Sequence, residues 1–153
     1  MAGVGAFGLA RSEDPYDLIR FVDAQAVDYP RALSELRAGE KRSHWMWYVF
    51  PQIAGLGHSP ISRRYSIKSA AEARAYLDHP VLGPRLRECF AAVTNIAGRS
   101  ATEIFGSPDD LKLRSCATLF DSVSDEDIFA QVIKKYFDGE RDEETLRLLR
   151  SNN

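Results

Sequence analysis

Three short stretches of the sequence combine cations with aromatic rings, hydroxyls or irregular backbone, a mixture suited to binding a small anion. The first, Lys41–Gln52 (KRSHWMWYVFPQ), contains both tryptophans of the chain. Flat aromatic faces can stack on a base or sugar ring, and nearby cations can bind phosphate or carboxylate. The candidate ligand-binding residues of this stretch are Lys41, His44, Trp47, Tyr48 and Gln52.

The second stretch is 51–68 (PQIAGLGHSPISRRYSIK), whose glycines, prolines and serines predict the longest connection in the chain. Long loops often carry function, and glycine lets the backbone approach a ligand closely. The loop contributes Arg63 and Arg64, although an arginine pair is also common on a solvated surface.

The third stretch follows Ser107–Pro108, where a helix is expected to begin. Lys112, Arg114 and Ser115 lie in its first turns, and the free amides of a helix N-terminus can hold an anion. The alternative is an ordinary surface pair between Asp110 and Arg114, which are four residues apart.

We expect these three stretches to form one pocket for a small phosphate- or carboxylate-bearing ligand, such as a nucleotide or an ADP-ribose-like molecule. The sequence assigns no catalytic residue and leaves open both hydrolysis of the ligand and enzyme activity. One alternative is a protein-interaction domain with the aromatic cluster as its contact patch. Another is that the aromatic residues only build the core.

Several functions are not indicated by the sequence. It has no P-loop, no nucleophile elbow and no dinucleotide-binding glycine motif, and the histidines at 44, 58 and 79 lack metal-site spacing. We therefore expect neither metal nor cofactor. The formal net charge of −2 makes nucleic acid an unlikely partner, and no apolar run is long enough for a membrane span. Cys89 and Cys116 lie in helical patterns, which fits reduced thiols in the cytoplasm.

The surrounding pattern predicts an all-α domain of seven or eight helices with one long loop. Residues 1–13 are expected to be a flexible terminus, and 14–150 a single domain. Asp14 before Pro15 predicts a first helix, and a second is expected from Pro30 to Gly39, giving a helical hairpin. The tryptophan stretch is expected to be a helix ending at Phe50, with Trp45 and Val49 toward the core and His44 and Tyr48 toward a ligand.

Later helices are predicted from their start signals. Ser69–Glu72 and Ser100–Glu103 are S-x-x-E capping boxes, and His79–Pro80 opens a helix that ends near Gly98. Further starts are predicted at Ser107–Pro108, Asp125 and Asp142.

Five phrases resemble a known family: DPYDLIRFVDAQ, LRAGEKRSHWMWYVFPQIAGLG, YSIKSAAEARAYLDHPVLGPRL, GRSATEIFGSPDDLKLRSCATLF and YFDGERDEETLRLL. The chain resembles the bacterial proteins with domain of unknown function 1810, sometimes labelled calpastatin-like, over nearly all of residues 14–149. The resemblance implies a mainly α-helical domain and no established activity. Calpastatin-type inhibitors are disordered repeat proteins, whereas this sequence is apolar, capped and free of repeats.

Overall fold

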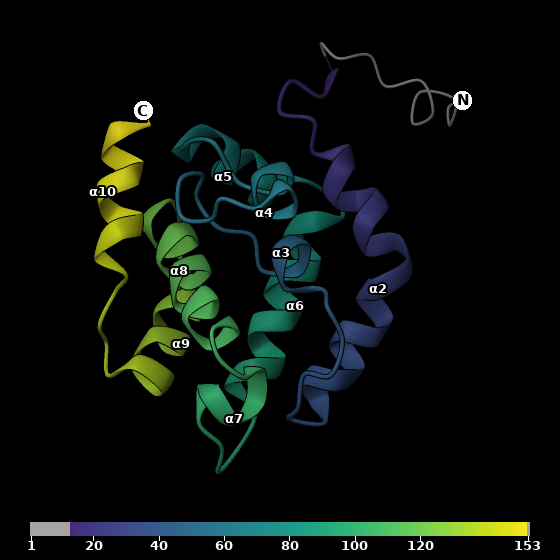
Figure 1. Ribbon diagram of the computed structural model, residues 1–153, viewed down its shortest axis with the longest axis vertical. Helices are drawn as coiled ribbons and strands as arrows, with labels where there is room; N and C mark the ends of the chain where they lie inside the picture. The colour runs from purple at the N-terminus through teal and green to yellow at the C-terminus, as the bar shows by residue number, and fades with distance from the viewer. Residues whose placement is uncertain (1–12, 153) are drawn as a thin grey trace.

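Nine α-helices build residues 13–152, the part of the chain that the computed structural model describes (Figure 1). Their bounds are α2 Ile19–Arg37, α3 Met46–Val49, α4 Pro60–Arg64, α5 Ala70–Asp78, α6 Leu82–Thr94, α7 Ala101–Phe105, α8 Asp109–Ser122, α9 Asp127–Phe137 and α10 Glu143–Ser151. The predicted all-α class is confirmed for these residues, with nine helices instead of seven or eight. Residues 1–12 of the predicted flexible terminus lie outside the described part.

Helix α6 runs through the middle of the fold, with α2 against one side and α9 against the other (Figure 1). Helix α8 packs on α9, and α10 packs on α8. Within residues 13–152, no helix is long and apolar enough to cross a membrane.

Aromatic side chains dominate the core between these helices. The Phe90 and Phe129 rings meet edge to face with centroids 4.9 Å apart, a favourable arrangement for ring quadrupoles. Cys89 and Cys116 are buried free thiols, as the sequence indicates, and burial raises the pKa of Cys89 to about 12. The largest fully buried aromatic side chains are Trp45, Tyr76, Phe21, Phe50, Phe90, Phe120 and Phe129.

A single helix, α2, replaces the predicted hairpin. Pro30 lies inside it, although proline removes one backbone hydrogen bond and usually ends or kinks a helix. This proline is exposed, so water can bond the carbonyl that it leaves free. The predicted break at Pro30 is wrong because one face stays buried through it, at Phe21, Gln25, Tyr29, Leu33 and Leu36.

The start of α2 also differs from the prediction. Asp14 is not the N-cap, which is Leu18, but its carboxylate accepts hydrogen bonds from the backbone N–H of Leu18 at 2.8 Å and of Ile19 at 3.1 Å. Asp17 adopts a left-handed conformation with φ of 53°, so the segment before Leu18 is a turn. The helix therefore begins at Ile19 and not at Pro15.

Three of the predicted serine and aspartate caps form, at Ser69, Ser100 and Asp142. Ser100 and Glu103 form both hydrogen bonds of a capping box. Ser69 accepts from Glu72 N at 3.2 Å, but the Glu72 carboxylate bonds Lys68 N and Arg20, so only half of this predicted box forms. Asp142 accepts from Thr145 N at 3.2 Å.

The starts of α6, α8 and α9 differ in detail from the predicted signals. His79 Nδ1 accepts from Val81 N and Leu82 N, so the histidine itself caps α6. Helix α8 begins at Asp109 without a side-chain cap from Ser107, and α9 begins at Asp127 after Glu126 instead of after Asp125. Each of these two N-caps lies one residue after the predicted one, because several acidic and hydroxyl residues adjoin each boundary.

The predicted long loop, residues 51–68, is closed at its base and contains α4. Ile53 and Ile67 form an isolated parallel bridge, in which Ile67 N donates to Gln52 O at 2.8 Å and Ala54 N donates to Ile67 O at 2.7 Å. Ser59 caps α4 by accepting from Ser62 N. No residue of α4 is buried, so the short helix lies on the surface above this base.

Candidate functional site

A cleft of about 230 Å³ lies where the tryptophan stretch, the 51–68 loop, the start of α8 and the cap of α10 meet. We call it the aromatic cleft. Its lining residues are Trp47, Gln52, Ile53, Leu56, Gly57, Ser62, Tyr65, Ser66, Pro108, Leu111, Lys112, Ser115 and Asp142. The three stretches singled out in the sequence therefore border one cavity.

Two lysines and one aspartate join the tryptophans to the start of α8. Lys112 Nζ lies 4.8 Å from the ring centroid of Trp47 and 3.0 Å from Asp109 Oδ1. Lys41 Nζ lies 5.1 Å from the ring of Trp45 and 2.9 Å from Asp109 Oδ2. Burial opposes ionisation of Asp109, but hydrogen bonds from both lysines outweigh it and lower its pKa. These three side chains carry two positive charges and one negative charge, and the Asp142 carboxylate of the cleft lining balances the remaining positive charge.

Ser115 and Asp142 supply the polar atoms on the other side of Lys112. Ser115 is 7% exposed, and its hydroxyl lies 3.1 Å from Asp142 Oδ2 and 3.2 Å from the Leu111 carbonyl. Asp142 also caps α10 through Thr145. The cleft thus presents an ammonium, a hydroxyl and a carboxylate beside aromatic and aliphatic walls.

Glu35, near the end of α2, fixes the backbone that leads into the tryptophans. One of its oxygens accepts from Arg42 N at 2.7 Å, from Ser43 N at 3.0 Å and from Trp45 Nε1 at 2.9 Å. The other accepts from Ser43 Oγ at 2.6 Å. Burial raises the pKa of this carboxyl, but the four hydrogen bonds together lower it to about 2. Glu35 therefore holds Trp45 in the core while Trp47 faces the cleft.

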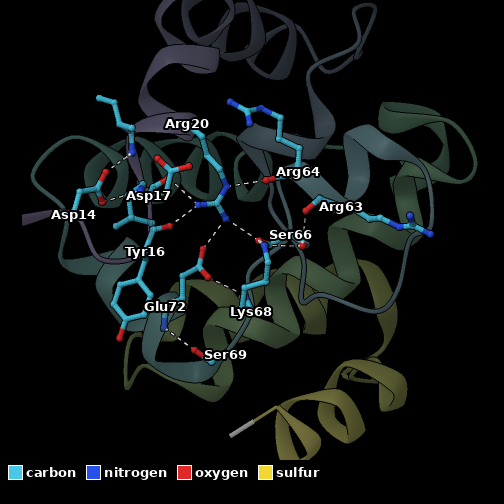
Figure 2. A network of polar contacts seen from close by, with 12 residues as sticks. Asp14, Tyr16, Asp17, Arg20, Arg63, Arg64, Ser66, Lys68, Ser69 and Glu72 are labelled. Atoms are coloured by element: carbon cyan, nitrogen blue, oxygen red, sulfur yellow. Dashed lines mark hydrogen bonds and ion pairs between the residues drawn. The ribbon is translucent and has the colours of Figure 1, made fainter. Parts of the chain in front are cut away.

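Arg20, near the start of α2, fixes the returning end of the loop, as Figure 2 shows. Its guanidinium donates to the carbonyls of Arg64 and Ser66, both at 2.8 Å, and to Glu72 Oε2 at 2.7 Å. Two further bonds reach the carbonyls of Tyr16 and Asp17. These five bonds use all five N–H groups of an arginine. Because Tyr65 and Ser66 line the cleft, Arg20 sets the position of that wall.

Four of the ten residues predicted for the site line the aromatic cleft: Trp47, Gln52, Lys112 and Ser115. Lys41 is not among the lining residues, but it is linked to Lys112 because both lysines pair with Asp109. Tyr48 does not face a ligand, because its ring is 9% exposed and its hydroxyl bonds Asp28. Trp45 and Val49 are buried as predicted, and His44 is exposed and absent from the cleft lining.

The predicted arginines lie elsewhere. Arg63 and Arg64 border a shallower hollow around Arg20 and Lys68, and their side chains extend in different directions in Figure 2. Arg114 lies 3.9 Å from Asp142 Oδ1 and its guanidinium carbon is 5.9 Å from the ring of Phe137. The Asp110 carboxylate bonds Thr102, so the predicted pair between Asp110 and Arg114 does not form.

Sequence reasoning missed the two groups that organise the cleft walls, Glu35 and Arg20, and also missed Asp142 as a lining residue. Glu35 and Arg20 sit in an amphipathic helix whose charged residues read as solvent-facing. No spacing in the sequence marked Arg20, which is nevertheless buried in the structure.

Comparison with known proteins gives a family and a fold but no activity. A family described as "Protein of unknown function (DUF1810)" matches residues 15–149. The crystal structure of the conserved hypothetical protein Rv1873 from Mycobacterium tuberculosis is similar, with 54% sequence identity and a TM-score of 0.88 over 89% of this chain and 98% of that one. No curated protein matches the chain.

Proposed function

This chain belongs to the DUF1810 family, and we propose that its aromatic cleft binds a small phosphate- or carboxylate-bearing ligand through Trp47 and Lys112. The single observation that carries the proposal is the pairing of these two side chains. An ammonium lies 4.8 Å from the ring of a partly exposed tryptophan inside a concave site. A planar group can stack on the tryptophan while its anionic substituent meets the lysine.

The size of the cleft limits what can enter. About 230 Å³ is below the usual range of roughly 300–1,000 Å³ for drug-sized ligands. One ring with a small anionic substituent fits this volume. A nucleotide or an ADP-ribose-like molecule would place one ring in the cleft and extend the remainder along the surface.

Binding has more support than hydrolysis. A serine nucleophile needs a base that can take its proton, and no histidine lines the cleft. Asp142, the nearest carboxylate to Ser115 Oγ, is already engaged as the cap of α10. The contact-patch alternative has less support as well, since Trp45, Met46 and Phe50 are fully buried.

The proposal can be tested by thermal unfolding and calorimetry with benzoate, AMP, ADP-ribose and inorganic phosphate. A ligand at 100 times its dissociation constant should stabilise the fold by roughly 2.7 kcal/mol. Lys112→Gln and Trp47→Ala should remove this stabilisation.

Lys134→Gln is the matched control, because Lys134 is exposed on α9 and outside the cleft lining. Arg63→Gln tests whether the ligand binds in the hollow around Arg20 instead of the aromatic cleft, because Arg63 lines only that hollow. Stabilisation that survives both cleft variants but disappears in Arg63→Gln would move the site to that hollow. An absence of stabilisation by every anion would reject the proposal.

A further inference from the structure

One carboxylate oxygen of Asp142, a residue of the cleft lining, accepts no hydrogen bond within residues 13–152 and has only a long ion pair with Arg114. Asp142 Oδ2 accepts hydrogen bonds from Thr145 N, Thr145 Oγ1 and Ser115. Asp142 Oδ1 accepts none from residues 13–152, and Arg114 Nη2 lies 3.9 Å from it, beyond hydrogen-bond distance. The Nε of Arg114 is itself buried without an acceptor in the same part of the chain. Asp142 Oδ1 can therefore still accept a hydrogen bond from a donor that the fold does not supply.

This carboxylate is an obstacle for a simple anion. A ligand carrying only negative charge would be drawn to Lys112 and repelled by Asp142 within the same small cavity. A buried or half-buried acceptor that loses water without gaining a donor also costs free energy. A ligand that brings its own N–H donor removes both penalties.

Ser115 strengthens the polar side of the cavity. It follows Lys112 by one helical turn, so both side chains lie on the same face of α8. Ser115 is 7% exposed and lines the cleft, and its hydroxyl bonds Asp142. The polar groups therefore change from donor to acceptor across the cavity, from the Lys112 ammonium to the Asp142 carboxylate.

We propose that the ligand is a single aromatic ring that bears an anionic group and an amino or amide donor. The anionic group meets Lys112, the ring lies on Trp47 and the N–H donor meets Asp142 Oδ1. This inference rests on the proposed function and narrows its ligand class. The carboxylate acts as a selectivity group, because it favours ligands with a donor and disfavours otherwise identical anions without one.

The probes are benzoate and 4-aminobenzoate, which differ by one amino group, measured by titration calorimetry at pH 7. The wild-type chain should bind 4-aminobenzoate at least about tenfold more tightly. Asp142→Ser keeps a side chain that can cap α10 and removes the carboxylate. In this variant the preference should disappear, and benzoate should bind more tightly than to the wild-type chain.

Asp121→Ser is the control, because Asp121 is outside the cleft lining and should leave the preference unchanged. If Asp142→Ser does not fold, Asp142→Asn keeps the shape and removes the charge, and benzoate should again bind more tightly. Equal wild-type affinities for the two probes, or a preference that persists without the carboxylate, would overturn the inference and leave the proposed function standing. Binding of neither these probes nor any other anion would instead reject the proposed function.

Discussion

Glu35 and Arg20 lie toward opposite ends of α2, and each fixes one irregular wall of the aromatic cleft. Glu35 is an acceptor and collects the N–H and O–H donors of residues 42–45. Arg20 is a donor and collects the carbonyls at the returning end of the 51–68 loop. One helix therefore satisfies the unpaired backbone donors of one segment and the unpaired acceptors of another.

The two anchors differ in how much charge they bury. Arg20 and Glu72 form a deeply buried ion pair, with side chains 6% and 2% exposed. Glu35 is half-buried, and its partners are neutral groups. Removing one member of a buried pair leaves an uncompensated charge, whereas removing the charge from Glu35 weakens only its hydrogen bonds. The Arg20 side should therefore be more sensitive to substitution.

The largest effect is expected for Arg20→Met. The substitution leaves Glu72 without its buried cation and removes a hydrogen bond from each of four carbonyls, which should destabilise the fold by about 3 to 5 kcal/mol. Urea denaturation at pH 7 measures the change. Arg31→Met, which removes an exposed arginine from the same helix, should cost less than about 1 kcal/mol. Equal costs for the two variants would contradict the contrast between the anchors.

Glu35→Gln should have a smaller effect, about 2 kcal/mol, because hydrogen bonds to a charged acceptor are stronger than those to a neutral amide. Urea denaturation at pH 7 again gives the value, with the exposed Glu140→Gln as its control. A cost at or above that of Arg20→Met would reverse the comparison.

Acid should remove the contribution of Glu35 as its carboxylate is protonated. Its folded pKa of about 2 lies below the usual value of 4.5, so its contribution is fully present above pH 4.5 and is lost as the pH falls toward 2. We expect roughly 2 kcal/mol of lost stability from this group, after allowing for its solvent exposure. The stability difference between the wild-type chain and Glu35→Gln should therefore shrink as the pH falls. A constant difference would show that the carboxylate is not the source of the effect.

Gly57→Ala should disturb the loop wall without touching either anchor. A Cβ at this position would lie 2.6 Å from Ser62 Oγ and 2.7 Å from Ser62 Cβ, so α4 must move. Because α4 is exposed and can shift, we expect a cost of about 1 kcal/mol by thermal unfolding. Ligand binding in the cleft should weaken in this variant. Unchanged binding would show that α4 contributes little to the site.

The smallest effect is expected for Arg42→Ala. The Arg42 side chain forms an exposed pair with Glu40 at 3.1 Å, while its backbone N–H donates to Glu35. Truncation should change the free energy of unfolding by less than about 0.5 kcal/mol. A large loss in chemical denaturation would mean that the side chain, and not the backbone bond to Glu35, orders this segment.

Local signals predicted much of the helical framework. Capping pairs such as Ser100 with Glu103 act over three residues, so their geometry follows directly from spacing. The prediction of a break at Pro30 failed because burial of one face along the whole of α2 outweighed the tendency of proline to end a helix. The short α4 was missed because its Ser59–Pro60 start lies in a stretch rich in glycine and proline.

The cleft was predictable only in part. Trp47, Lys112 and Ser115 were identifiable by chemical type, and they do share one cavity. The contacts that position the walls join residues far apart in sequence, such as Arg20 with Ser66 and Arg20 with Glu72, 46 and 52 residues away. No local pattern encodes such pairings. Asp142 was assigned to a helix cap, which is correct but gives no indication that the same carboxylate also borders the cleft.

The bridge between Ile53 and Ile67 closes the base of the loop with two backbone hydrogen bonds, and Arg20 holds its returning end at Arg64 and Ser66. Between these fixed points, the exposed part around α4 can change length and sequence while the helices keep their places. The entropy of loop closure grows slowly, by about 0.6 kcal/mol for each doubling of length. Exchanging this exposed part would therefore alter one wall of the cleft without altering the helical core.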